Sequence, residues 1–168
     1  MPRNTKKLTI LSLLLGISLI IFILEAQLPP LAPIPGIKPG LANIITLIAL
    51  CWFGKRDALL LLLLRILLGG IFTGTAASLL YSLSGGLAAF FIMALADSLF
   101  REPRPLWIIS ILGAVGHNAG QIGAAIFVTG VWQIAAYFPA LLISAVITGL
   151  FTGVAAAVTL RRCPRPRL

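Results

Sequence analysis

The sequence predicts an all-α membrane protein whose six transmembrane helices form one bundle, with broken segments on its outer side. The 168 residues are 60% hydrophobic and only 10% charged, and their mean hydropathy is +1.09. This balance is far from that of a soluble globular domain. A spanning helix takes about 20 apolar residues, so the length allows about six spans and leaves no room for a separate soluble domain. We therefore expect a single transmembrane domain over residues 1–168. The expected spans cover about residues 8–27, 40–53, 57–72, 76–99, 106–129 and 132–160.

The positions of the basic residues predict the topology. Eleven of the 13 lysines and arginines lie at the N-terminus, in two short connections or in the C-terminal tail. Six alternating spans put these four places on one side of the membrane, which is the positive-inside pattern, so both termini are expected in the cytoplasm. The net charge of +9 then serves mostly to orient the protein in the membrane, where anionic lipid headgroups also attract it. A nucleic-acid partner is not expected, because no basic patch with interleaved aromatic residues occurs.

The first apolar run, residues 8–24, follows a basic start. It is long for a signal peptide and ends in a poor cleavage site, so we interpret it as a retained helix. Ser12 and Gly16 give this helix a small-residue face on which another helix could lie closely.

A proline- and glycine-rich segment, residues 34–43, separates the first two runs. Prolines at 29, 30, 33, 35 and 39 remove backbone donors, so no regular helix can pass through 28–40. A break near membrane depth persists only where protein or a watery cavity satisfies the backbone. With Lys38 and Asn43, this segment is a candidate wall of a binding site, although a plain external loop would also contain such prolines.

The second and third runs are short for full spans. We expect a cytoplasmic turn at 54–57 between them and a second glycine-rich break at 69–75, on the same side as the proline segment. Small residues recur at every fourth position of the sixth run, which predicts close helix packing in a tight bundle. These residues are Ala145, Gly149, Gly153 and Ala157, and also Ala136, Ala140, Ser144 and Thr148.

Polar side chains inside the spans are the most informative residues, because burying them in hydrocarbon is costly unless they meet partners or water. Arg65 lies about nine residues into its helix, hence roughly 13 Å deep, and is expected to face the bundle interior. Either it contacts an anionic ligand or it pairs with Glu25, and one residue can do both.

Cys51 and Cys163 predict neither a disulfide nor a metal site.

A second polar cluster lies on the fifth run. His117 and Gln121 are i,i+4 neighbours beside Asn118 and a glycine stripe, so they line either a cavity or a packed helix contact. The stripe consists of Gly113, Gly116, Gly120 and Gly123. By their expected depth, the polar residues lie in the middle or outer half of the membrane, which predicts one outward-opening pocket. The pocket is mildly electropositive and suits a small ligand with a carboxylate or phosphate and an apolar body. The candidate ligand-binding residues are Lys38, Asn43, Arg65, His117, Asn118 and Gln121, with Glu25 as a structural partner.

Enzyme chemistry is not expected, and neither is a cofactor. The four acidic residues are scattered, one histidine and two distant cysteines form no metal cluster, and no Walker-type phosphate loop occurs. We therefore expect no catalytic residue and no ATP hydrolysis by the chain itself.

Three sequence blocks resemble a known family. Residues 35–43, 65–74 and 116–121 are similar to the bacterial Gx transporter family, often labelled heptaprenyl diphosphate synthase component I, over roughly residues 20–160. That family is similar in size and layout to the substrate-binding S components of energy-coupling factor (ECF) transporters. The resemblance implies an S-component-like bundle in the bacterial inner membrane, with an outward-facing pocket for a vitamin- or cofactor-precursor-like molecule. It also implies a membrane scaffold, the T component, and a pair of ABC-type ATPases as partners.

A contrasting hypothesis is a non-catalytic membrane subunit that serves isoprenoid-quinone synthesis or a flavin-dependent redox complex. Such a subunit would bind a soluble enzyme at the basic cytoplasmic segments. The sequence does not identify the ligand in either case.

Overall fold

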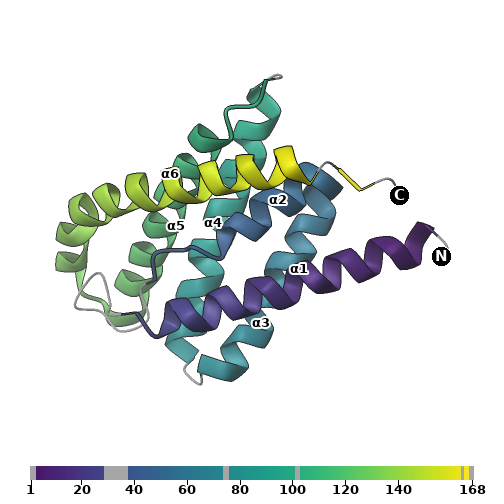
Figure 1. Cartoon of the computed structure of the whole chain (residues 1–168). Coiled ribbons are helices and arrows are strands. Elements are labelled where there is room, and N and C mark those ends of the chain that lie inside the picture. Colours follow the sequence, from purple (N-terminus) through teal and green to yellow (C-terminus); the bar gives the residue numbers. More distant parts are fainter. Residues whose placement is uncertain (1–2, 29–37, 74–75, 101–102, 164, 167–168) are drawn as a thin grey trace.

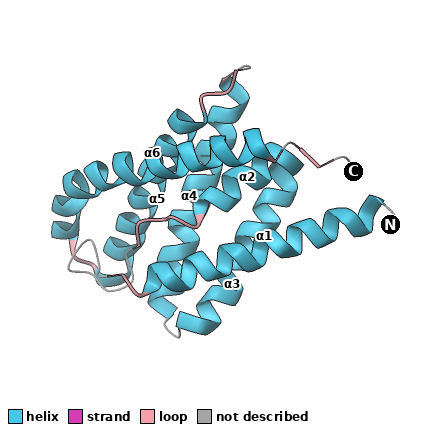
Figure 2. Cartoon of the chain, in the orientation of Figure 1, coloured by secondary structure: helices cyan, strands magenta, loops and turns pink. Residues whose placement is uncertain are grey.

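The computed structural model describes residues 3–28, 38–73, 76–100, 103–163 and 165–166 (Figure 1). Figure 2 shows helices joined by short connections, with no strand in this described part of the chain. The predicted all-α class is therefore confirmed. The elements are α1 (Arg3–Ala26), α2 (Asn43–Phe53), α3 (Lys55–Thr73), α4 (Ala76–Leu99), α5 (Leu106–Thr129), the 3-10 turn η1 (Trp132–Tyr137) and α6 (Phe138–Arg162).

Four helical stretches are long and apolar enough to cross a membrane, namely Thr5–Ala26, Ala76–Leu99, Leu106–Thr129 and Trp132–Arg162. By contrast, α2 has 11 residues, which corresponds to about 16 Å, or about half of a hydrocarbon core. Large apolar side chains such as Phe127 and Ile71 lie exposed on the outside, as lipid contact requires. The chain is a membrane protein, and the number of six spans stays a prediction.

The connection between α2 and α3 is shorter than the sequence suggested. The sequence predicts a turn over residues 54–57, but only Gly54 is non-helical and α3 already begins at Lys55. Gly54 has φ +89°, a backbone conformation that other residues rarely adopt, so one residue suffices to reverse the chain.

The expected glycine-rich break at 69–75 is wrong for residues 69–73, which continue α3; residues 74 and 75 lie outside the described part. The two glycines permit close packing. A Cβ on Gly69 would lie 2.5 Å from the Phe22 ring of α1, and one on Gly70 would lie 2.3 Å from Leu79 of α4. A side chain at either position would have to displace the Phe22 ring or the Leu79 side chain, so the two glycines allow this close packing without ending the helix.

The sixth helix also differs at its start. The expected run 132–160 divides into η1 and α6, and Pro139 stands at the first turn of α6. Because proline lacks an N–H and favours the first helical turn, it begins an α-helix there and disfavours one that runs through from Trp132.

Helices α4, α5 and α6 lie closely together. Of the two stripes predicted on the sixth run, the one with Ala145, Gly149 and Gly153 is buried, whereas Ala136 and Ala140 of the other are exposed. A Cβ on Gly120 of α5 would lie 2.6 Å from the Ser84 carbonyl oxygen of α4, and one on Gly149 of α6 would lie 2.6 Å from the Ile111 Cα of α5. The hydroxyls of Ser110 and Thr152 are 2.8 Å apart and join α5 to α6. Gly123, which we had included in the stripe, has nothing within 4 Å of such a Cβ and takes no part in this packing.

Helix α1 is less enclosed. Ser12 is exposed, and a Cβ on Gly16 would have nothing within 4 Å, so none of the described helices packs closely on the small-residue face. Beside it, an apolar groove of about 110 Å³ lies between α1 and α3. The groove is lined by Leu8, Leu11, Ser12, Leu15, Asp57, Leu60, Leu61 and Leu64.

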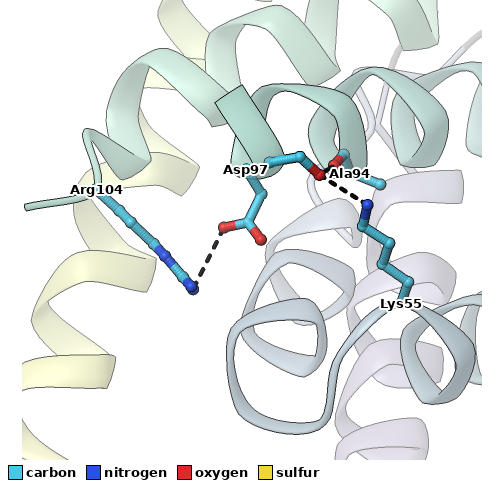
Figure 3. A network of polar contacts seen from close by, with 5 residues as sticks. Lys55, Ala94, Asp97 and Arg104 are labelled. Atoms are coloured by element: carbon cyan, nitrogen blue, oxygen red, sulfur yellow. Dashed lines mark hydrogen bonds and ion pairs between the residues drawn. The ribbon is translucent and has the colours of Figure 1, made fainter. Parts of the chain in front are cut away.

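Polar contacts gather the basic segments at one end of the bundle. Lys7 of α1 pairs with Asp57 of α3 at 2.8 Å, and Arg104 pairs with Asp97 of α4 at 3.3 Å. Figure 3 shows the second pair beside Lys55, whose ammonium donates to the Ser98 hydroxyl at 2.7 Å. Residues near the start of α1, the α2–α3 junction and the α4–α5 connection therefore lie together, as the charge pattern requires. Which side of the membrane this end faces stays a prediction.

Candidate functional site

The segment that leads into α2 is held by a buried carboxylate at the end of α1. Glu25 is 4% exposed, and its Oε1 accepts hydrogen bonds from the backbone N–H groups of Gly40 and of Leu41, the latter at 2.9 Å. Gly40 has φ +83°, and a Cβ there would lie 2.8 Å from the His117 ring. Only glycine fits this position, between α1 and α5. Of the predicted break, residues 29–37 lie outside the described part, while residues 38–40 are non-helical as expected.

Arg65 reaches the first residue of α2. Its guanidinium Nη2 donates to Asn43 Oδ1 at 3.1 Å, and both side chains are buried. Arg65 Nε and Asn43 Nδ2 have no hydrogen-bond partner among the described residues. The alternative of a direct ion pair between Arg65 and Glu25 is not what the described contacts show, because Glu25 binds backbone amides and Arg65 binds an amide side chain.

The polar pair of α5 closes the opposite wall. Gln121 Nε2 lies 3.0 Å from His117 Nε2, and Gln121 Oε1 accepts the backbone N–H of Lys38 at 3.2 Å. The predicted i,i+4 relation therefore connects α5 directly to the segment before α2. His117 Nδ1 has no hydrogen-bond partner among the described residues. A Cβ on Gly85 of α4 would lie 2.8 Å from Gln121, so a glycine makes room for this pair.

The Lys38 ammonium rests on an aromatic face. Its Nζ lies 3.8 Å from the centroid of the Phe22 ring, a cation–π distance, and donates no hydrogen bond to any described residue. Burial lowers the pKa of the Lys38 ammonium from its ordinary value, while the nearby Glu25 carboxylate raises it. A buried ammonium with free N–H groups is a ready partner for an anion.

These side chains surround one cavity of about 10 Å³, roughly the volume that a single water molecule needs. Of the seven predicted residues, six line it: Glu25, Lys38, Asn43, Arg65, His117 and Gln121. The other lining residues are Phe22, Gly40, Ala42 and Ser82. Helices α1, α2, α3, α4 and α5 all contribute, so residues far apart in the sequence converge on one point.

Asn118 lies elsewhere. Its Nδ2 donates to the Leu141 carbonyl oxygen of α6 at 2.7 Å, and the side chain is 1% exposed. Successive residues of a helix face different directions, so Asn118 turns towards α6 while His117 and Gln121 face the cavity. The structure places it in a packing contact between helices.

Two cavity residues were missed from the sequence. Phe22 precedes Glu25 by three positions and therefore shares its helix face, a signal that was available. Ser82 gave no signal, because a serine in a membrane helix usually bonds its own backbone. Here the Ser82 hydroxyl is buried and has no hydrogen-bond partner among the described residues.

One family model matches residues 14–159, and its description is heptaprenyl diphosphate synthase component I. The chain belongs to this family. The match includes all the cavity residues and confirms the resemblance drawn from the three sequence blocks, that is, to the Gx transporter family. No curated protein and no solved structure matches the chain.

The family name includes a synthase, but the family is a non-catalytic component I. Prenyl diphosphate chemistry uses Mg²⁺ held by clustered carboxylates. Among the residues that the structure describes, no group of three or more His, Cys, Asp or Glu side chains could hold a metal ion. The site therefore offers hydrogen-bond donors and cations for binding, and offers no cluster for metal-assisted chemistry in this part of the chain.

Proposed function

We propose that the chain is the substrate-binding membrane subunit of an ECF-like uptake transporter in the bacterial inner membrane. Its ligand is a small anionic molecule of the vitamin or cofactor-precursor type. The observation that carries this proposal is the convergence of Lys38, Arg65 and His117 on one cavity inside a membrane protein. Membership of the Gx transporter family supports it.

The donors around the cavity favour ligand binding over mere packing. Buried polar groups are nearly always hydrogen-bonded, because an unsatisfied one costs about 1–3 kcal/mol. Here five such groups on the cavity wall have no hydrogen-bond partner among the described residues. They are Lys38 Nζ, Asn43 Nδ2, Arg65 Nε, Ser82 Oγ and His117 Nδ1. Most of them are donors, so a ligand rich in acceptor oxygens complements them.

The size of the cavity adds a conformational step to the proposal. At about 10 Å³ it is far smaller than the roughly 300–1,000 Å³ of ordinary ligand pockets. The described conformation is therefore a closed one, and a ligand enters when the segment Lys38–Ala42 moves away from Glu25. That segment is non-helical and its hydrogen bonds to α1 come from a single carboxylate, which makes it the most easily displaced wall.

Transport needs energy that this chain does not supply, since the sequence has no Walker-type loop. We propose that a T component and ABC-type ATPases supply it. The small-residue face of α1, with Ser12 and Gly16, is exposed and has none of the described helices packed closely on it, so it is a suitable surface for the scaffold.

Native mass spectrometry of the purified protein tests the proposed function. We expect a co-purifying small anion on the wild-type chain and its loss from Arg65→Ala and from His117→Ala, with both variants still folded by circular dichroism. Arg56→Ala is the matched control, because Arg56 is exposed at the basic end. If the small molecule persists in both cavity variants, and only loss of basic-end arginines disturbs partner binding, the contrasting role as a docking subunit for a soluble enzyme replaces this one.

A further inference from the structure

The cavity contains an uneven set of charges. Among its described lining residues, Lys38 and Arg65 are cationic and Glu25 is the carboxylate. All three are buried, and Glu25 interacts electrostatically with both cations. With Glu25 ionised and His117 neutral, the lining therefore carries one net positive charge.

The carboxylate is not placed to neutralise either cation by a direct hydrogen bond. Its Oε1 is used by the backbone amides of Gly40 and Leu41. Lys38 Nζ lies over the Phe22 ring, and Arg65 Nε has no hydrogen-bond partner among the described residues. Lys38 Nζ and Arg65 Nε thus remain for a ligand, while Arg65 Nη2 is used by Asn43 and the negative charge of Glu25 stays within the same buried space.

We propose that Glu25 is a specificity-determining residue that restricts the cavity to ligands with a single negative charge, such as monocarboxylates. One negative charge brings the buried set to neutrality. A phosphate monoester with two charges leaves an excess negative charge, and uncompensated buried charge is strongly disfavoured. This inference rests on the proposed function and narrows its ligand class from anions in general to monoanions.

The test compares two probes that share one aromatic body, benzoate and phenyl phosphate. Binding to the full-length chain in detergent is measured by isothermal titration at pH 8, where an ordinary imidazole is neutral. Phenyl phosphate is then doubly charged, since the second pKa of a phosphate monoester is about 6. We expect wild type to bind benzoate more tightly than phenyl phosphate. In Glu25→Gln the ratio of the two affinities should shift towards phenyl phosphate by about tenfold or more, because charges within one buried cavity interact strongly.

The matched control is Asp57→Asn, which removes one negative charge at the basic end, where Asp57 pairs with Lys7. It should leave the preference unchanged. An unchanged preference in Glu25→Gln, or a wild-type preference for phenyl phosphate, overturns the inference.

A second variant keeps the test decisive if Glu25→Gln does not fold. Lys38→Gln brings the cavity to zero net charge, so the affinity for neutral benzamide relative to benzoate should rise by a similar factor. An unchanged ratio of these two affinities overturns the inference.

The inference and the proposed function fail on different results. If wild type binds neither anion, the proposed anionic ligand fails as well, whereas binding of both anions with no response to either substitution contradicts only the role of Glu25.

Discussion

The two polar regions of the bundle handle charge in opposite ways. At the basic end, Lys7 pairs with Asp57 and Arg104 with Asp97, and these side chains are between 13% and 36% exposed. In the cavity, Arg65 and Lys38 are 3% and 7% exposed, and each retains an N–H group with no hydrogen-bond partner among the described residues. Partly exposed pairs are nearly neutral for stability, whereas buried unpaired donors are costly. Under the proposed function, the unpaired donors of the cavity are kept for a ligand, while the pairs of the basic end need none.

The largest expected effect is on binding. Arg65→Met keeps a long side chain but removes every donor, and a hydrogen bond to a charged group contributes about 1.5–3 kcal/mol. We expect ligand affinity to fall about ten- to hundredfold, measured by titration of the ligand that co-purifies with wild type. Arg56→Met, at the exposed basic end, should leave affinity unchanged. Equal affinities of wild type and Arg65→Met would remove Arg65 from the site.

Helix packing gives the next effect. In Gly120→Ala the new Cβ would lie 2.6 Å from the Ser84 carbonyl oxygen, and α4 and α5 must separate to admit it. We expect a loss of about 1–3 kcal/mol, seen as a lower unfolding temperature in detergent. Gly123→Ala is the matched control, since a Cβ there meets nothing within 4 Å and alanine favours helix by about 1 kcal/mol. A Gly120→Ala variant as stable as Gly123→Ala would contradict the close crossing.

A substitution at Gly40, in the segment before α2, should lower the free energy of unfolding by about 1–2 kcal/mol. Gly40→Ala forces a left-handed conformation on alanine and brings its Cβ to 2.8 Å from the His117 ring. Gly54→Ala strains the backbone too, at φ +89°, but meets nothing within 4 Å. We therefore expect both variants to lose stability and only Gly40→Ala to lose ligand retention. Equal retention in the two variants would show that the Gly40 contact with His117 does not shape the site.

The smallest effect is expected at the basic end. Asp97→Asn removes the carboxylate of the ion pair with Arg104, a pair that is partly exposed. Such pairs contribute about 0–1 kcal/mol, so the unfolding temperature should change little and ligand retention should stay the same. A loss of ligand binding in this variant would mean that the two polar regions are coupled.

Much of the fold could be predicted from apolar runs, because membrane depth requires long uninterrupted helices. Glycine was the weak point. The same residue type reverses the chain at Gly54, fits beneath Phe22 at Gly69 and leaves room for a Cβ at Gly123. These roles depend on which neighbour lies opposite, and that is a tertiary property which one sequence does not contain.

The candidate site was predictable for a different reason. Ionisable and amide groups at membrane depth need polar partners, so Lys38, Arg65 and His117 could be expected to lie close together. The structure shows that they line one cavity. The direction of individual bonds could not be foreseen. Glu25 binds the amides of residues 40 and 41 rather than pairing with Arg65, because those amides come within reach only when the segment folds back over α1. That these residues bind a ligand stays a prediction.

An experimental structure of the protein purified with its native small molecule tests the central claim most directly. The account predicts ligand density in a widened cavity, with an anionic group contacting Arg65 Nε and Lys38 Nζ and with residues 38–42 displaced from their described position. A small molecule seated instead in the apolar groove between α1 and α3, with Glu25 still on its two amides and the cavity unchanged, would contradict it.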